Sequence, residues 1–445
     1  MLNGLKNKMN NIYMDDSIPL NSFKKRIVYM IKQRVTKADI TTFSRLNRLK
    51  KRKSHTNRKI QVVFLLQMPE VWGKQKSIYY EMKRDERIHT VVLAIPKFDI
   101  QKQCCETGRN EAYDFAVSEN LSEIVRADTN EGLVDLKNLN PDYVFYQRPY
   151  EAYLPKEYRS DHVIEYAKTC YVPYAIFATL EGEMIREYER GFARNIYINF
   201  VSSRDMENRL KKKFFLTSKL KLRKFRYLGI PILENILRCS SSEAGNRVWQ
   251  EWGDSSNKLK ILWTPRWTTD DKLGGSHFFQ YNEEICRFAL KNDDFFIVLR
   301  PHPLAFANYI REGLMTEKEV EAFKQKLERT SNMALDDRKE YIDTFWGADV
   351  LITDISSMLL EFFVTGKPVI FCGTDIKLNS LYSEVVDATY QCGSWNEIEM
   401  VLCELQNGED RLKEKRQRLI ETLFGDLENT SHRIVEEIAN DYLQD

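Results

Sequence analysis

The sequence predicts an α/β protein built from two successive sets of parallel strands and helices. Short, continuous apolar runs alternate with helical stretches along most of the chain, as buried parallel strands and their crossover helices do. The length of 445 residues suits two or three domains. A glycine and a proline interrupt the alternation at Gly229–Pro231. We therefore expect two Rossmann-like domains that join near this point.

The first half of the chain contains six apolar runs of strand length. They predict strands at Gln61–Gln67, His89–Ile95, Asp142–Tyr146, Cys170–Phe177, Asn195–Val201 and Phe225–Leu228. A helix is expected at 70–84, between the first two strands.

The second half repeats the alternation more clearly. It predicts strands at Leu259–Thr264, Asp294–Arg300, Asp349–Thr353 and Pro368–Cys372. Helices are expected at 281–292, 317–330, 338–348, 356–365 and across the tail at 394–443.

Residues 1–58 differ from the rest of the chain and form an expected N-terminal arm. Fourteen Lys or Arg residues and one acid lie between Lys24 and Lys59, and part of this stretch is amphipathic. A second basic run covers 209–226. Such segments favour anionic partners such as lipid head groups, although a solvated arm explains the charge equally well. The expected domains are then 59–228 and 229–405, followed by C-terminal helices at 406–445.

The composition argues against a secreted or membrane-spanning protein. No run approaches the roughly 18 apolar residues that span a bilayer, and the N-terminus lacks the apolar core of a signal peptide. The eight cysteines show no zinc-ligand spacing and are typical of reduced thiols. We expect a cytoplasmic protein, peripheral on the cytoplasmic face of the membrane, with no structural metal.

Polar residues follow each expected strand of the second half. Ligands of open parallel sheets bind at the carboxyl ends of strands, so these residues should gather at one edge. They are Thr264, Arg266, Arg300, His302, Thr353, Asp354, Ser356 and Ser357.

This set suits phosphate chemistry. Arginine binds phosphate in a bidentate way, helix-opening serines present backbone amides to an anion, and a histidine can donate to a phosphoryl oxygen or move a proton. Taken singly, each residue has a simpler explanation, since Asp354 and Ser356 are also good helix N-caps. The convergence of the set is what favours a functional site.

Four segments together resemble the CDP-glycerol glycerophosphotransferases, the family of teichoic acid polymerases. They are ILWTPRWT (261–268), RPHP (300–303), TDISSMLLEF (353–362) and TGKPVIF (365–371), and the junction RYLGIPILENIL (226–237) resembles the family's linker. The likeness is clear over roughly 225–375 and faint before it.

The resemblance implies a GT-B fold, with two Rossmann-like domains, parallel sheets facing a central cleft, and C-terminal helices that cross back over the first domain. It implies an enzyme that transfers an alditol phosphate from a CDP-activated donor to a hydroxyl of a glycan, wall-polymer or lipid-linked acceptor and releases CMP, with no other cofactor. By match, His302 would be the catalytic or phosphate-stabilising histidine. Arg300, Asp354, Ser356 and Ser357 would hold the donor, together with Glu361, the acid of the motif.

The sequence departs from the family at one position. Members carry a second catalytic histidine in the first domain, and the corresponding region, 171–183, contains none. Glu181 or Glu183 are candidate replacements as the base, and His162 and His277 are further candidates. The segment PDYVFYQRPY (141–150) ends an expected strand with Gln147, Arg148 and Tyr150, which offers an acceptor-side edge or simple strand-end packing.

Three other functions remain open on the sequence alone. A GT-B glycosyltransferase that uses a nucleotide sugar would need a similar phosphate cradle. A non-catalytic relative would explain the missing histidine. The basic arm also suits nucleic acid, but it lacks any recognition motif, so nucleic acid is not expected as a partner.

Overall fold

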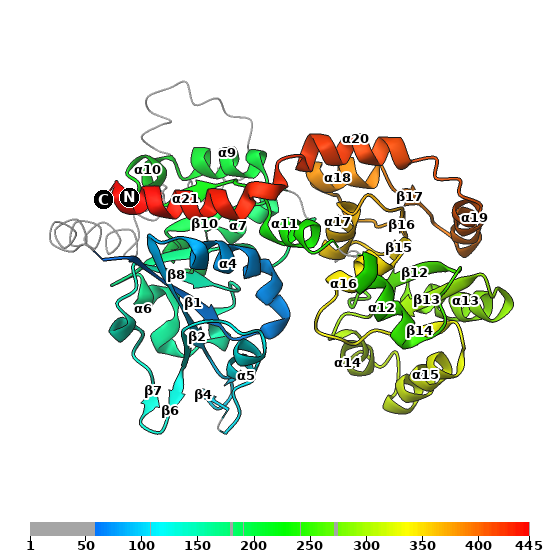
Figure 1. Cartoon of the computed structure of the whole chain (residues 1–445), viewed down its shortest axis with the longest axis horizontal. Coiled ribbons are helices and arrows are strands. Elements are labelled where there is room, and N and C mark those ends of the chain that lie inside the picture. Colours follow the sequence, from blue (N-terminus) through cyan, green and yellow to red (C-terminus); the bar gives the residue numbers. More distant parts are fainter. Residues whose placement is uncertain are drawn as a thin grey trace, which may run out of the picture.

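The computed structural model describes residues 58–444, apart from residues 107, 179–180, 190, 241 and 271–274 and the side chains of 181–183, 216 and 242. Two parallel sheets, each covered by helices, form two lobes that lie side by side (Figure 1). The expected N-terminal arm lies outside the described residues, apart from Arg58. None of the described helices combines the length and apolar character needed to cross a membrane.

The first lobe is built on a seven-stranded sheet in the order β11-β10-β9-β8-β1-β2-β5, and all its neighbouring strands are parallel. Its strands are β1 (Ile60–Leu66), β2 (Ile88–Ala94), β5 (Ile124–Arg126), β8 (Tyr143–Tyr146), β9 (Lys168–Tyr171), β10 (Ile198–Phe200) and β11 (Lys224–Arg226). Two short hairpins project from it: β3 (Phe98–Asp99) with β4 (Cys104–Cys105), and β6 (Asp128–Thr129) with β7 (Gly132–Leu133).

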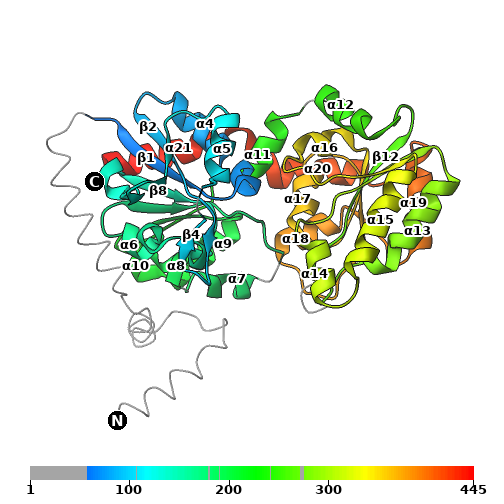
Figure 2. The same ribbon diagram turned by 90° about the horizontal axis from the view of Figure 1, so that it is seen from below.

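Helices cover both faces of this sheet (Figure 2). They are α4 (Lys76–Arg84), α5 (Glu111–Ser118), α6 (Ser160–Val163), α7 (Glu181–Glu187), α8 (Gly191–Asn195), α9 (Arg204–Lys213) and α10 (Phe215–Lys219). Short 3-10 helices are also present: η1 (Pro69–Lys74), η2 (Leu136–Leu139), η3 (Glu151–Tyr153) and η4 (Lys156–Tyr158).

The second lobe is built on a six-stranded parallel sheet in the order β14-β13-β12-β15-β16-β17. Its strands are β12 (Leu259–Thr264), β13 (Phe295–Leu299), β14 (Met333–Leu335), β15 (Val350–Thr353), β16 (Val369–Phe371) and β17 (Tyr390–Gln391). Its helices are α11 (Pro231–Arg238), α12 (Ser242–Trp252), α13 (Phe278–Lys291), α14 (Ala305–Arg311), α15 (Glu317–Arg329), α16 (Ile342–Gly347), α17 (Ser357–Phe363), α18 (Ser380–Val386), α19 (Trp395–Gln406) and α20 (Lys413–Phe424).

The C-terminal helices connect the two lobes. Helix α20 stays on the second lobe, where Phe424 joins the core. After a 3-10 turn, η6 (Leu427–Asn429), helix α21 (Thr430–Leu443) crosses to the first lobe (Figure 1). There, apolar side chains of α21, including Ile434 and Ile438, pack into the core of the seven-stranded sheet. The C-terminal segment therefore ties the lobes together.

A buried ion pair also joins the lobes. Lys74, at the end of η1 in the first lobe, places its Nζ atom 2.6 Å from Oε1 of Glu361, on α17 in the second lobe. The hydroxyl of Tyr341 donates to the other carboxylate oxygen of Glu361. Both partners of the ion pair are removed from bulk water, which makes this contact sensitive to the loss of either one.

The structure differs from the predicted elements in specific places. The expected strand Cys170–Phe177 ends at Tyr171, two residues before Pro173, and the rest is loop, because proline cannot donate to the ladder. Strands β5, β14 and β17 are only two or three residues long and carry no run that the sequence analysis could recognise. The tail is not one helical stretch, since a turn with Gly408 at φ +82° separates α19 from α20.

Candidate functional site

The carboxyl ends of four adjacent strands, β13, β12, β15 and β16, lie at one edge of the second sheet. The predicted site residues follow these ends, as the topology requires. At the edge itself, Thr264 pairs with Thr353, and their hydroxyl oxygens are 2.8 Å apart. Both residues are buried. These two threonines fasten β12 to β15, and their expected contact with a donor stays a prediction.

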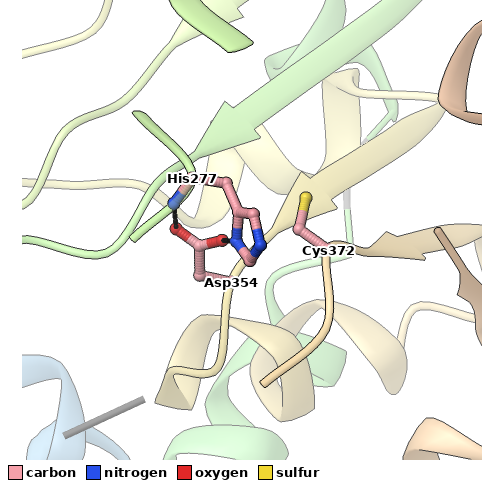
Figure 3. Close-up of side chains that lie close together, drawn as sticks. All are labelled: His277, Asp354 and Cys372. Carbon is pink, nitrogen blue, oxygen red and sulfur yellow. Dashed lines mark hydrogen bonds and ion pairs between the residues drawn. The ribbon is translucent and has the colours of Figure 1, made fainter. Parts of the chain in front are cut away.

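Asp354, directly after β15, is the centre of this edge. Its side chain is buried, and Oδ2 accepts hydrogen bonds from the backbone N–H groups of Arg266, at 2.7 Å, and His277, at 3.2 Å. Its Oδ1 lies 2.6 Å from Nδ1 of His277 (Figure 3). Asp354 thus fixes the loops after β12 as well as one histidine ring.

The contact with Asp354 sets the tautomer of His277. A carboxylate accepts but does not donate, so Nδ1 carries the proton and Nε2 keeps a lone pair. The ring also stacks on Tyr281, with centroids 5.4 Å apart and planes 10° from parallel. The side chain keeps 22% of its surface exposed. His277 is therefore an oriented proton acceptor, which the sequence offered only as one of several alternatives.

Cys372, after β16, completes a small group with His277 and Asp354 (Figure 3). Potential ligand atoms of the three residues lie within 4.8 Å of one another, so the group could hold a metal ion. Burial raises the pKa of the Cys372 thiol well above its ordinary value, and the Nδ1 proton of His277 is already bonded. A metal bound through Cys372 would have to displace the thiol proton, which the raised pKa opposes, so we interpret the group as a histidine oriented by a carboxylate.

His302 has the opposite tautomer. It lies in the loop between β13 and α14, and its Nδ1 accepts a hydrogen bond from the backbone N–H of Leu304 at 3.1 Å. The ring stacks on Trp267, with centroids 5.5 Å apart. Although the residue is exposed, surrounding protein displaces water, and the charge of Arg266 adds to this effect, so the pKa falls to about 4. At neutral pH the ring is uncharged and presents Nε2–H as a donor.

The two arginines of the site already have partners within the protein. Arg300 places Nη1 2.7 Å from Oδ2 of Asp336, and its Nη2 donates to the carbonyl of Arg338 at 2.7 Å. Arg266 donates from Nε to the hydroxyl of Thr268 at 2.8 Å. Arg300 therefore braces the loop after β14, while Arg266 lies among the residues that surround His302. Contact of either arginine with a donor phosphate stays a prediction.

The serines after β15 start helix α17. Ser356 is its N-cap residue, but its hydroxyl makes no cap bond, and Oγ is buried without a hydrogen-bond partner among the described residues. A buried hydroxyl without a partner is costly, so this atom is suited to a ligand. Ser357 opens the helix. Glu361, one turn later, is instead engaged with Lys74 and Tyr341 and is fully buried.

Three of the four alternatives for the base lie on helices of the first lobe. Glu181 and Glu183 lie on α7, where their side chains are outside the description, so their role stays a prediction. His162 lies on the short helix α6 of the first lobe. Among the alternatives whose side chains the structure describes, His277 lies at the edge that holds His302 and Ser356, and His162 lies on the first lobe.

Comparison with known proteins indicates the same family as the sequence motifs. Residues 186–401 match the model of the family described as CDP-Glycerol:Poly(glycerophosphate) glycerophosphotransferase. A teichoic acid glycerol-phosphate primase of Bacillus subtilis (strain 168) is 26% identical over 203 residues. That alignment covers 46% of this chain and 46% of the relative, so it spans less than half of the relative's length.

Solved structures share the fold at low sequence identity. UDP-GlcNAc 2-epimerase from Neisseria meningitidis, bound to UDP-GlcNAc, is 13% identical, with a TM-score of 0.55 over 86% of this chain and 100% of that chain. A variant of the wall teichoic acid polymerase TagF is 14% identical, with a TM-score of 0.52 over 96% of this chain and 99% of that chain. The predicted GT-B-like class, with two parallel α/β sheets and a helical C-terminal region, is thereby confirmed.

The family match begins on α7, in the first lobe, and ends on α19, so it contains His277, His302, Asp354 and Ser356. The resemblance seen in four short motifs is confirmed, because all four lie within residues 186–401, which match the model of the CDP-glycerol:poly(glycerophosphate) glycerophosphotransferase family.

Proposed function

We propose that the protein transfers glycerol phosphate, or a related alditol phosphate, from a CDP-activated donor to a hydroxyl of a glycan, wall-polymer or lipid-linked acceptor in teichoic acid synthesis. The observation that carries this proposal is the RPHP loop within the family match, which presents His302 as a neutral N–H donor at the same sheet edge as the start of α17. No other cofactor is proposed.

In the proposed reaction, the acceptor oxygen attacks the phosphorus that bears the alditol. A new phosphorus–oxygen bond forms, the bond from this phosphorus to the bridging oxygen breaks, and CMP leaves with the electron pair. His302 donates from Nε2 to an oxygen of the reacting diphosphate, where negative charge increases in the transition state. Ser356 offers a second donor through its unpartnered hydroxyl.

A base must remove the proton from the acceptor hydroxyl, and His277 has a nitrogen with a free lone pair for this step. Its Nε2 lone pair is available because Asp354 holds the proton on Nδ1 at 2.6 Å. A histidine whose Nδ1–H is held by a carboxylate is oriented to accept a proton at Nε2. We therefore assign the base to His277, with Asp354 as its positioning residue, in preference to Glu181 or Glu183. This assignment places both proton-handling residues on the second lobe.

We also propose that the protein works at the cytoplasmic face of the membrane. The support is the basic character of residues 24–59 and 209–226, which suits anionic lipid head groups. In the described part, several cations of the second run are paired on the protein itself, for example Arg209 with Asp205 and Lys211 with Glu207. The N-terminal segment is therefore the main candidate for membrane contact.

The test of the activity is nucleotide release. Purified protein is incubated with CDP-glycerol and crude bacterial membranes, and CMP and membrane-bound phosphorus are both measured. We expect one phosphorus to join the acceptor for each CMP released, and His302→Ala to reduce both about 10²–10³-fold. Release of UDP from a UDP-sugar, with no phosphorus added to the acceptor, would replace this proposal with a glycosyltransferase.

A further inference from the structure

Four aromatic side chains lie at the carboxyl edge of the first sheet, and none of them belongs to the proposed donor site. This aromatic cluster consists of Tyr150, Tyr153, Tyr174 and Phe177. Tyr150 and Tyr153 belong to the segment after β8, and Tyr174 and Phe177 belong to the loop after β9. Strands β8 and β9 are neighbours in the sheet, so the two loops leave it side by side.

Three of the four rings contact in series edge to face, and the fourth, that of Tyr153, lies under Arg148. The centroids of Tyr150 and Tyr174 are 5.7 Å apart, and those of Tyr174 and Phe177 are 6.0 Å apart. The hydroxyls of Tyr150 and Tyr174 are hydrogen-bonded at 2.6 Å. Arg148 lies over the Tyr153 ring at 4.9 Å and is held by the side chain of Gln67 at 2.8 Å. These contacts fix the orientation of the cluster without burying it.

Much of this aromatic surface is exposed. Tyr150 keeps 46% of its surface accessible, Tyr153 44% and Phe177 41%. Simple packing of strand ends would bury rings of this size, as it does for Tyr146 and Tyr171 at the last positions of β8 and β9. A group of exposed rings held in fixed orientations marks a binding surface.

The cluster is connected directly to the donor side of the site. The hydroxyl of Tyr382, on α18, lies 2.7 Å from the carbonyl oxygen of Ile176 and 3.1 Å from that of Ser356. Asn379 donates from its side-chain nitrogen to the carbonyl of Phe177 at 2.7 Å. The loop that carries Tyr174 and Phe177 is therefore anchored to the second lobe beside the N-cap of α17.

We propose that the aromatic cluster binds a sugar ring of the acceptor. The C–H-rich face of a pyranose packs against an aromatic face, while tyrosine hydroxyls and the Arg148 guanidinium hydrogen-bond to ring hydroxyls and substituents. An open-chain polyol phosphate has no comparable flat face and would gain little from four rings. The cluster thus specifies an acceptor that ends in a cyclic sugar rather than a bare alditol phosphate chain.

This inference rests on the proposed function for its biological meaning, but binding can be measured without any turnover. The probe is N,N′-diacetylchitobiose, offered to the full chain with no donor present and detected by saturation-transfer NMR. We expect saturation of the sugar ring protons with the unmodified protein. Tyr150→Ala and Tyr174→Ala should reduce the signal at least fivefold, and Tyr150→Phe, which keeps the ring, should retain most of it.

The matched control is Phe215→Ala. Phe215 is an equally exposed aromatic of the first lobe, at 49%, but it lies on α10. Its removal should leave sugar binding unchanged. If the disaccharide does not bind, or binds equally to the alanine variants, the proposal is wrong. Binding of glycerol 3-phosphate at the cluster in place of the sugar would also overturn it.

Turnover gives a separate measurement. With a sugar-terminated acceptor and CDP-glycerol, Tyr174→Ala should raise the acceptor KM about tenfold and change the KM of CDP-glycerol less than twofold. An equal rise in both would contradict an acceptor role. If no CMP is released by the unmodified protein or by any variant, the proposed activity is wrong. The NMR measurement still shows whether the aromatic cluster binds sugar.

Discussion

Nζ of Lys74 lies 2.6 Å from Oε1 of Glu361, and this buried contact joins two residues 287 positions apart in the chain and in different lobes. The side chain of Glu361 is wholly inaccessible and that of Lys74 is 11% exposed. Both charges have lost most of their hydration, and each depends on the other for compensation. The contact therefore fixes how η1 of the first lobe meets α17 of the second.

Lys74→Met should destabilise the protein strongly, because it leaves the carboxylate of Glu361 buried without its cation. Removal of one partner from a buried pair costs about 3–5 kcal/mol. The double variant Lys74→Met, Glu361→Gln should recover much of this loss, because no charge is then left alone. The measurement is thermal unfolding by circular dichroism.

Lys339→Met is the matched control for this pair. Lys339 also reaches across to the first lobe, where its Nζ is 3.7 Å from Oε1 of Glu70, but both side chains are well exposed. An exposed pair contributes about 0–1 kcal/mol, so the melting temperature should hardly change. Equal effects of Lys74→Met and Lys339→Met would show that burial does not determine the strength of the contact.

His302 should stay neutral throughout the range in which most histidines titrate. Its pKa of about 4 lies below the ordinary value of 6.5, so the NMR titration of its ring should have a midpoint near 4. Comparison with His302→Gln assigns the signal among the six histidines of the chain. A midpoint near 6.5 would contradict the crowded environment described for this ring.

The low pKa of His302 also determines how the free energy of unfolding changes with pH. The unfolded chain binds a proton at His302 below about pH 6.5, while the folded protein does not until about pH 4. Protonation therefore favours the unfolded state as the pH falls from 6.5 to 4. His302→Gln should lessen the loss of stability over this window, and its amide N–H should retain more activity than His302→Ala, which we expect to lose about 10²–10³-fold.

Asp354→Asn should reverse the tautomer of His277 without disturbing the fold. The asparagine oxygen can still accept from the backbone N–H groups of Arg266 and His277, which leaves its NH₂ group facing Nδ1 of the ring. Nδ1 must then accept, the proton moves to Nε2, and the proposed base is lost. We expect kcat to fall about 10²–10⁴-fold, in the range that general base catalysis supplies.

Two measurements separate this role from others. Nitrogen-15 NMR of the ring reports the tautomer directly, and the metal content of the purified protein shows whether His277, Asp354 and Cys372 hold an ion instead. His89→Gln is the control, because His89 also contacts a carboxylate, with Nε2 2.9 Å from Oε1 of Glu123, but in an exposed position on the first lobe. Unchanged kcat in Asp354→Asn would move the base elsewhere, with Glu181 and Glu183 the next candidates.

The sequence predicted the four central strands of the second sheet because these buried parallel strands are continuous apolar runs. It could not predict the partners of the polar residues, which come from distant parts of the chain. His277 was only one of four alternatives as a base, since its orienting carboxylate lies 77 positions away. Arg300 and Glu361 were expected to contact a donor, but Asp336 and Lys74, which the motifs do not include, engage them in the structure.

The aromatic cluster illustrates the same limit on the first lobe. The sequence places Tyr150 after an expected strand, where it could either pack against the strand end or contact the acceptor. Its partner Tyr174 lies 24 positions later, in a stretch expected to be strand. Because β9 ends at Tyr171, this stretch is instead a loop that can place both rings together.

Asp441 should anchor helix α21 to the first lobe in a pH-dependent way. Burial opposes its ionisation, but the nearby charges of Lys168 and Lys224 hold the pKa of this carboxyl far below its ordinary value. A depressed carboxyl pKa contributes stability that is complete above the unfolded value of about 3.9 and is lost as the pH falls below it. Asp441→Asn should therefore destabilise the protein at pH 7 by about 3–5 kcal/mol, since Lys168 is left buried without its anion.

The pH dependence distinguishes this charge effect from a loss of packing. The unmodified protein should lose stability steeply below pH 4, whereas Asp441→Asn, already weaker at pH 7, should lose less over the same interval. Glu428→Gln, a carboxyl at the start of the C-terminal segment without a buried partner lysine, should follow the unmodified curve. Parallel stability curves for Asp441→Asn and the unmodified protein would mean that the lysines do not lower the pKa of Asp441, and that apolar packing of α21 alone holds the C-terminal helix on the first lobe.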